Sequence, residues 1–471
     1  MDDLARASER ETRAAALAGA VAAGLALALG WGFTVDDAWI SARVAWNLAE
    51  GRGYAFNPGG PRVDAVTPLG WAHVLAPFAA RGPAAAVVAA RWGGATATVL
   101  ATAWLGREVA RLAGSRWRYA PLAVLAASLP FGAWAGAGME TGFVVALATR
   151  ALGADRWALA AGGLAAAWRP ELTPWAMTLA ALRGERLAAL GAPAAWRALA
   201  VLGPVLTVAA ARLALFGSPL PLAVVAKPSD LAHGARYVAA ASLHLGIPAL
   251  AVAPGAWRLA PWSTRALGLA CVAHAGALVL VGGDWMSLFR LAVPVLPGLT
   301  LAAASLAAAA RPRATVLRVG IGAALAVRLG LELGPAARGV AAQRAELIEA
   351  VRPALVGARR VVALDVGWVG TAYTGELVDL AGVTDPEVAG YSGGHTSKRW
   401  PAGALARRDV DGAVLLLAPN EELATPWWRS AFAREVERRA AGELQARRVE
   451  RLATTPLRGT GQRYVWLRFA P

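Results

Sequence analysis

The sequence predicts an α-helical polytopic membrane protein with a C-terminal soluble α/β domain. Its 471 residues are 57% hydrophobic and only 17% charged, whereas charged residues make up about a quarter of an average soluble domain. Several long stretches carry no charge at all, beginning with residues 14–35. A run of about 20 apolar residues is enough to cross the roughly 30 Å hydrocarbon core of a bilayer.

Charge-free length and flanking arginines place about eleven transmembrane helices in the first part of the chain. The first run is too long for the apolar core of a signal peptide, so we expect it to remain as the first helix. The predicted spans are residues 14–34, 92–110, 119–135, 141–152, 157–168, 172–182, 198–216, 237–256, 266–282, 291–310 and 314–333.

The arginine clusters predict the orientation. The positive-inside rule places the N-terminus in the cytoplasm, with residues 68–80 as an amphipathic segment along the outer interface. The net charge of +16 is scattered over helix ends, unlike the basic stripe of a nucleic-acid-binding surface. The inward clusters are Arg107, Arg111, Arg116 and Arg118; Arg150 and Arg156; Arg183, Arg186 and Arg197; Arg258 and Arg265; and Arg311 and Arg313.

The composition changes after Leu333, where Arg and Glu become frequent and no further span follows. We therefore expect a transmembrane domain at 1–335, with its first outer loop at 35–91, and an extracytoplasmic α/β domain at 336–471. Cys271 is the only cysteine, which excludes an intrachain disulfide and a cysteine-based metal site. Hydrophobic periodicity predicts helices at 338–357 and 426–441 and strands at 361–366, 377–381, 413–417 and 464–469.

The predicted outer loops hold most of the carboxylates of the chain, and polar groups gathered at one end of a helix bundle indicate a functional face. The first of these loops begins with Asp36 and Asp37, followed by helical spacing that ends at Glu50-Gly51. Acidic residues at a helix start often serve only as caps. Capping and catalysis are therefore both open for these two aspartates.

Short motifs follow one another along nearly the whole chain. They are DDAWISAR at 36–43, FNPG at 56–59, TPLGW at 67–71, GMET at 138–141, RPE at 169–171, FGSPLP at 216–221 with Lys227, GGDWM at 282–286 with Arg290, DLAGVTD at 379–385, and Gly394-His395. In this order they resemble glycosyltransferases of the GT-C fold. The resemblance is to the group with the terminal β-1,2-arabinofuranosyltransferase of mycobacterial cell walls and related mannosyltransferase-like membrane proteins.

The resemblance implies an inverting enzyme of cell wall biogenesis in the bacterial inner (plasma) membrane. It would transfer arabinofuranose or mannose from a polyprenyl-phosphate donor to an envelope glycan, glycolipid or protein on the outer face. Trp39 and the stretch Asp64–Thr67 depart from the usual family pattern, which leaves the sugar and the acceptor open.

The implied chemistry assigns roles to residues. The acceptor hydroxyl must lose its proton as it attacks the anomeric carbon, and Asp36 or Asp37 fits this base. Cations should neutralise the leaving lipid phosphate. The candidate cations are Lys227, Arg290 and Arg169, and the expected cavity residues are Trp39, Arg43, Trp71, Glu140, Glu171, Asp284, Trp285 and His395.

Each of these roles has a structural alternative. Arg290 could anchor a helix end, Arg169 could pair with Glu171, and Glu140 could be a helix cap. A divalent cation (Mg, Mn or Ca) could bind an aspartate of the first loop together with Glu171 or Asp284, because hard cations prefer oxygen ligands. No spaced set of His or Cys residues demands a metal.

Three other functions compete with glycosyl transfer. A transporter or lipid flippase would also bury polar groups in a helix bundle, but it should show two related halves with broken helices, and the sequence shows no such symmetry. A non-catalytic relative that scaffolds envelope assembly would not need both aspartates and Lys227. A polysaccharide polymerase or ligase is the third alternative, and it would use a donor that carries a long glycan chain and not a single sugar.

Overall fold

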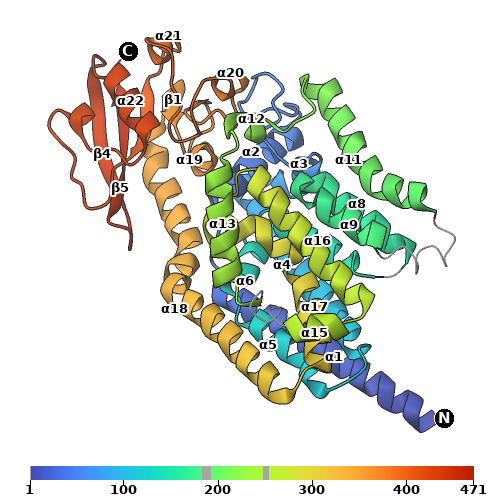
Figure 1. Cartoon of the computed structure of the whole chain (residues 1–471). Coiled ribbons are helices and arrows are strands. Elements are labelled where there is room, and N and C mark those ends of the chain that lie inside the picture. The colour runs from blue at the N-terminus through green and yellow to red at the C-terminus, as the bar shows by residue number, and fades with distance from the viewer. Residues whose placement is uncertain (1, 154, 183–192, 248–253, 471) are drawn as a thin grey trace. The chain divides into compact units, whose positions relative to one another are not determined.

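The computed structural model describes residues 2–153, 155–182, 193–247 and 254–470, most of them helical (Figure 1). The chain forms two compact units. The helical unit comprises Met1–Thr34, Ala90–Val208 and Ser229–Arg338, and the mixed unit comprises Val35–Ala89, Ala209–Pro228 and Gly339–Pro471. The first loop therefore belongs to the same unit as the C-terminal sheet.

The helical unit is built around α16, which packs against α9, α13 and α17 (Figure 1). Helices α4, α11 and α18 each continue from one unit into the other. The helices are α1 Asp2–Gly30, α4 Pro83–Ala110, η1 Arg116–Tyr119, α5 Ala120–Ala126, α6 Leu129–Ala135, α7 Thr141–Arg150, α8 Arg156–Trp168, η2 Pro170–Leu172, α9 Thr173–Leu182, α11 Ala194–Phe216, α13 Leu231–His244, α15 Pro254–Leu259, α16 Trp262–Leu280, η3 Ser287–Val295, α17 Leu296–Ala309 and α18 Pro312–Val351.

The prediction of eleven spans is wrong, because the described residues contain six helices that are long and apolar enough to cross a bilayer. All six coincide with predicted spans. They are Glu9–Gly30, Pro83–Ala110, Ala194–Phe216, Trp262–Leu280, Ser287–Ala309 and Pro312–Leu355. The chain is thus mostly helical with several candidate membrane spans and a small C-terminal sheet.

The remaining predicted spans are apolar but short or interrupted. Helices α7 and α9 have 10 residues each, which cover only about 15 Å at 1.5 Å per residue. Residues 119–135 split into η1, α5 and α6, with Ser128 capping α6 just before Pro130. Helix α13 ends at His244, and residues 248–253 of the span predicted there lie outside the described residues, as do Arg183 and Arg186 of one arginine cluster.

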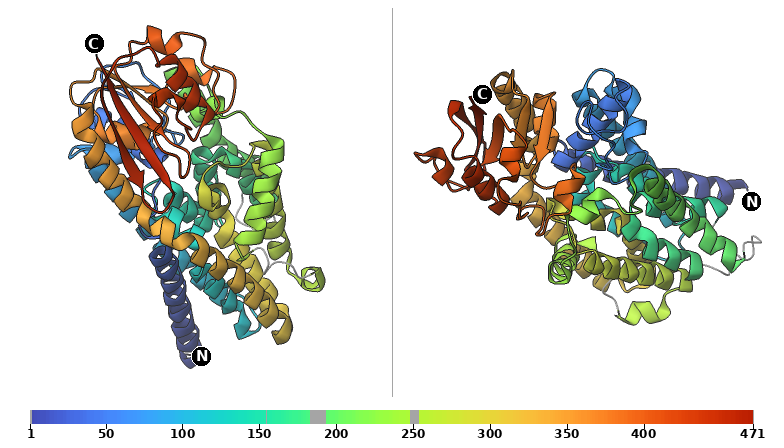
Figure 2. Two further views of the ribbon diagram at one scale, coloured as in Figure 1. Left: turned by 90° about the vertical axis from the view of Figure 1, so that its left-hand side faces the viewer. Right: turned by 90° about the horizontal axis from the view of Figure 1, so that it is seen from above.

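The mixed unit contains a five-stranded sheet in the order β2-β1-β3-β5-β4. Strand β1 is parallel to β2 and β3, whereas β5 is antiparallel to β3 and to β4, with which it forms a long hairpin (Figure 2). The elements are α2 Asp36–Ala49, α3 Trp71–Ala79, α12 Leu222–Ala226, η4 Arg352–Leu355, β1 Arg360–Ala363, α19 Val366–Ala372, β2 Glu376–Asp379, α20 Pro386–Ala389, α21 Ala404–Arg407, β3 Gly412–Leu416, η5 Trp427–Arg429, α22 Glu435–Glu443, β4 Val449–Leu457 and β5 Gln462–Phe469.

Four strands were predicted and are found as β1, β2, β3 and β5. The prediction missed β4, an edge strand that is mostly exposed or half-buried and therefore lacks strong apolar alternation. The helix predicted at 338–357 is no separate element, because α18 continues as one helix of 40 residues to Val351. The helix predicted at 426–441 begins only at Glu435.

Candidate active site

Asp36 and Asp37 lie in the first turn of α2, as the sequence predicts, but Asp36 does not cap its own helix. Helix α2 has no side-chain cap hydrogen bond. The two carboxylate oxygens of Asp36 instead accept hydrogen bonds from the backbone N–H groups of Gly367 and Trp368, each at 2.9 Å. A carboxylate is favoured at the N-terminus of a helix, and here that helix is α19.

Arg43 follows Asp36 after two turns of α2 and reaches the other end of α19. It is fully buried. Its guanidinium donates hydrogen bonds to the carbonyl oxygens of Gly370 and Tyr373 at 2.6 Å each and to that of Gly375 at 2.7 Å. The negative charge at the start of α19 and the positive charge at its end both match the helix dipole. Arg43, predicted to line a substrate cavity, therefore joins α2 to the C-terminal region.

Residues of two other sequence motifs, FNPG and DLAGVTD, form hydrogen bonds to the backbone. The side-chain amide of Asn57 exchanges two hydrogen bonds of 2.9 Å with the backbone of Leu377 in β2. The buried carboxylate of Asp379 accepts hydrogen bonds from Ala381 N–H at 2.7 Å and from the N–H and hydroxyl of Thr384 at 2.7 and 2.9 Å. Both motifs thus order the loops around β2.

Gly367 and Gly370 allow α19 to lie directly against α2. A Cβ on Gly367 would stand 2.1 Å from the backbone oxygen of Asp36, and one on Gly370 would stand 2.8 Å from Cδ of Arg43. The first of these obstacles is backbone, which cannot move aside as a flexible side chain would. The spacing of the two glycines on α19 therefore sets how closely the first loop approaches the C-terminal region.

Gly367→Ala is expected to destabilise the mixed unit by about 1–3 kcal/mol, the usual cost of overpacking. Thermal unfolding of the detergent-purified protein measures the effect. Gly442→Ala in α22 is the matched control, because a Cβ there meets nothing within 4 Å. Equal melting temperatures for Gly367→Ala and the wild-type protein would contradict the close packing.

A second carboxylate, Asp365, lies one residue before α19 and belongs to a network of charged groups. It accepts hydrogen bonds from Nη2 of Arg434 at 2.8 and 3.1 Å and from the hydroxyl of Tyr464. Arg434 also donates to Glu437 at 3.0 Å, and Nη1 of Arg344 lies 3.4 Å from the Tyr464 hydroxyl. We call this set the Asp365 network: Arg344, Asp365, Arg434, Glu437 and Tyr464.

The surroundings move the pKa values of the two carboxylates in opposite directions. Burial, reinforced by the charge of Asp365, raises the pKa of Asp36 to about 7, against the effect of its two N–H donors and Arg344. Burial also opposes ionisation of Asp365, but Arg434, Arg344 and the Tyr464 hydroxyl outweigh it and hold the pKa of Asp365 below its usual range. Near neutral pH, Asp36 is thus poised to take up a proton while Asp365 stays ionised.

The helical unit holds a second cluster of predicted residues. Glu140 is fully buried and forms an ion pair with Arg169, which also lies 3.9 Å from Glu171. Arg290 pairs with Asp284 at 2.9 Å. Nη1 of Arg290 lies 3.7 Å from the sulfur of Met139, the residue before Glu140. The structure therefore brings together five residues predicted from three separate motifs: Glu140, Arg169, Glu171, Asp284 and Arg290.

The backbone before Arg290 is strained. Leu288 and Phe289 have φ values of 63° and 55°, a left-handed conformation that costs a non-glycine residue about 1–3 kcal/mol and is often found at functional sites. The indole N–H of Trp134 donates to the carbonyl of Leu288 at 2.9 Å, and the guanidinium of Arg290 lies 5.6 Å from the Trp134 ring. Trp134 thus supports the strained turn that orients Arg290.

The three predicted phosphate-binding cations differ in their partners. Arg169 and Arg290 have carboxylates beside them, so a phosphate would have to share each guanidinium with an acid. Lys227 follows α12, which packs against α20, and no ion-pair partner of Lys227 occurs among the described residues. Lys227 is therefore the cation of the three whose charge is not already compensated.

The predicted aromatic and histidine residues occupy different environments. Trp39 and Trp71 are buried where α2 packs against α3, so neither ring offers a surface to a sugar. Trp285 is 57% exposed and stacks on His233, with ring centroids 4.0 Å apart. His395 is half-buried in the loop that follows α20.

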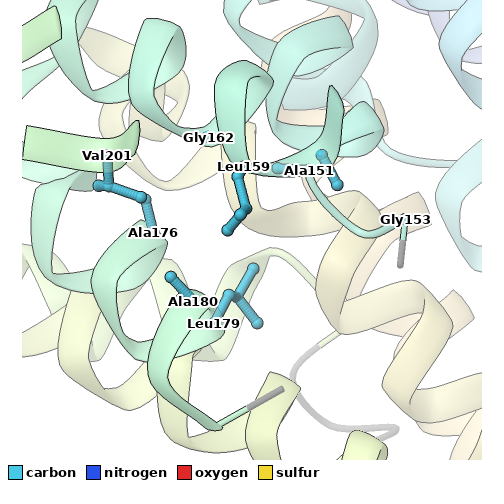
Figure 3. A pocket seen from close by; sticks show the side chains of 9 residues that line it. Ala151, Gly153, Leu159, Gly162, Ala176, Leu179, Ala180 and Val201 are labelled. Carbon is cyan, nitrogen blue, oxygen red and sulfur yellow. The ribbon is translucent and has the colours of Figure 1, made fainter. Parts of the chain in front are cut away.

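Two cavities of the helical unit have mainly apolar linings. A pocket of about 20 Å³ between α8, α9 and α11 is lined by Ala, Gly, Leu and Val residues, so its lining offers no reactive side chain (Figure 3). A larger cavity of about 250 Å³ lies between α13, α16 and α17 and includes His274. The ring nitrogens of His274 lie 3.0 Å from the carbonyl oxygen of Glu171 and 2.8 Å from that of Leu291, so this cavity adjoins the second cluster.

Among the residues that the structure describes, no three His, Cys, Asp or Glu side chains gather in a way that could hold a metal ion. A divalent cation held by an aspartate of the first loop and one further carboxylate stays an open possibility.

Sequence reasoning missed the Asp365 network and a buried ion pair between Asp64 and Arg212, 2.8 Å apart. A signal existed for each. Asp365 lies near the carboxyl end of the strand predicted at 361–366, and functional groups of α/β folds gather at such strand ends. Arg212 is the single charge within an otherwise apolar predicted span, a position that calls for a partner.

Comparison of the chain with family models, with curated proteins and with solved structures finds no significant match.

Proposed function

We propose that the chain is a membrane glycosyltransferase that moves arabinofuranose or mannose from a polyprenyl-phosphate donor to an acceptor of the bacterial cell envelope. The acceptor oxygen attacks the anomeric carbon while its proton passes to a carboxylate. The bond from that carbon to the phosphate oxygen breaks, the lipid phosphate leaves, and the anomeric configuration inverts.

The observation that carries the proposal is the state of Asp36. It begins α2 soon after a candidate membrane span ends at Gly30, which suits a donor anchored in lipid. Its pKa is raised to about 7, and a general base works best when its pKa is close to the operating pH. We assign the base to Asp36, with Asp37 as its neighbour in the first turn.

Two further features support a lipid phosphate donor. Lys227 carries the uncompensated charge that a departing phosphate requires, since an ammonium group stabilises the developing negative charge. The apolar cavity of about 250 Å³ in the helical unit has a lining suited to isoprenoid carbon.

Transfer of labelled sugar from synthetic polyprenyl-phosphate arabinose and polyprenyl-phosphate mannose tests the function. Detergent-purified protein is incubated with each donor and an extract of envelope glycans. Consumption of one donor with formation of a labelled product would support the proposal and identify the sugar. Movement of intact donor across proteoliposome membranes without consumption would instead favour a flippase.

The pH dependence of transfer provides a sharper prediction. Only the ionised carboxylate accepts a proton, so kcat/KM is expected to rise about tenfold per pH unit below the pKa of Asp36 and to level off above it. The bend should lie near pH 7, because burial and Asp365 raise the pKa of Asp36 to about 7. A profile that is flat between about pH 5 and pH 8 would exclude Asp36 as the base.

A further inference from the structure

The N-terminus of α19 has an unusual arrangement of its capping groups. Asp365 occupies the N-cap position, yet its side chain makes no cap hydrogen bond. An aspartate at this position ordinarily accepts a hydrogen bond from the second or third N–H group of its helix. In α19 these groups belong to Gly367 and Trp368, and both donate to Asp36 from the first loop.

The reason is visible in the partners of Asp365. Its carboxylate is occupied by two hydrogen bonds from Arg434 and one from Tyr464. Arg434 is fixed in turn by Glu437, which accepts hydrogen bonds from its side chain at 3.0 Å and from its backbone N–H at 3.2 Å. The Asp365 side chain is therefore held away from the N–H groups that it would otherwise cap.

We propose that Arg434 and Tyr464 are positioning residues, which restrain Asp365 so that Asp36 alone caps α19 and keeps the orientation that proton transfer requires. The C-terminal domain would in this way complete the active site. The inference depends on the proposed function only for its catalytic consequence, because the competition of two aspartates for one helix end is a property of the fold.

The alternative state follows from the same geometry. Without Arg434, the Asp365 carboxylate would lose two charge-assisted hydrogen bonds, which are about twice as strong as neutral ones. It could then cap its own helix at the short distance that is usual for an N-cap. Asp36 would lose both of its N–H donors and become free to rotate.

Kinetics of the full-length protein test the catalytic consequence. Arg434→Gln is expected to lower kcat at least about tenfold, a part of what a general base contributes, with little change in KM for the donor. The double variant Arg434→Gln, Asp365→Ala should regain most of the lost kcat, because the competing carboxylate is gone. Arg434→Lys should keep more activity than Arg434→Gln.

Arg439→Gln is the matched control, since Arg439 lies on α22, the helix that Arg434 directly precedes, and pairs with Glu435 at an exposed site. Its kcat should equal that of the wild-type protein. A merely structural role of Arg434 predicts a different result, because removing a second member of the network would not restore activity. A double variant as impaired as Arg434→Gln would overturn the proposal.

Hydrogen exchange of residues 366–372 tests the competition without any substrate. In the wild-type background, Asp36→Asn should speed the exchange of this segment, because Gly367 and Trp368 lose their charged acceptor. In the Arg434→Gln background the same change should have little effect, since Asp365 has taken over the cap. Equal acceleration in both backgrounds would overturn the proposal even if transfer were never detected.

Discussion

Asp36→Asn is expected to lower kcat for sugar transfer by about 10²- to 10⁴-fold, the range that a general base contributes. The amide cannot accept the proton of the acceptor hydroxyl. The carbonyl oxygen of the asparagine can still accept a hydrogen bond from one of the two N–H groups of α19, so the fold should largely survive. Single-turnover rates with the labelled donor measure the loss, and thermal unfolding verifies that the protein remains folded.

Asp37→Asn and Glu50→Gln provide the comparison for that result. Glu50 directly follows α2, is exposed and lies 3.6 Å from Arg52, so its substitution should leave kcat unchanged. If Asp37→Asn abolishes transfer while Asp36→Asn does not, Asp37 is the base and Asp36 only anchors α19. Full activity in both aspartate variants would show that neither Asp36 nor Asp37 is the general base.

The structure also shows why Asp36 could not be assigned from the sequence. Helix α2 itself was predictable, because two acids mark its start and Glu50-Gly51 marks its end. The partner of Asp36 is 331 residues away in the chain, and no periodicity or spacing connects positions so distant. Only the fold reveals that the acid caps a helix other than its own.

The helical unit illustrates a different limit. Residues 141–182 are apolar, and charge-free length with flanking arginines predicted three transmembrane helices there. The structure instead has short helices in this region, α7 to α9. Gly138 at positive φ comes before α7, and the turn at Arg169-Pro170 separates α8 from α9. Their ends carry Glu140 and Arg169, and buried charges at short-helix ends are compatible with an apolar region only when they are paired.

The pairing of the charged residues could be predicted only in part from the sequence. The spacing of Arg169-Pro170-Glu171 suggested an ion pair within the motif, and the two groups do lie 3.9 Å apart, but the closer partner of Arg169 is Glu140. Arg169 pairs more closely with Glu140 than with its sequence neighbour Glu171, because an unpaired buried charge costs far more than a loosely paired, more exposed one. Glu140 has 0% exposure and Glu171 is half-buried, which explains the outcome.

Arg169→Gln is expected to produce the largest loss of stability in the helical unit. It removes the counterion of the fully buried Glu140, and breaking a buried pair from one side costs about 3–5 kcal/mol. Thermal unfolding in detergent should show a clear drop in melting temperature. Arg150→Gln is the control, because its pair with Asp155 is half-exposed and such pairs are worth about 0–1 kcal/mol.

The double variant Glu140→Gln, Arg169→Gln separates charge burial from loss of packing. Two neutral amides of similar volume can hydrogen-bond to each other and leave no buried charge, so the double variant should be more stable than Arg169→Gln alone. Replacing both members of a buried pair is often nearly neutral for stability. If the losses of stability in the double-mutant cycle are strictly additive, Glu140 and Arg169 are not energetically coupled. The second cluster would then not act as a single polar centre.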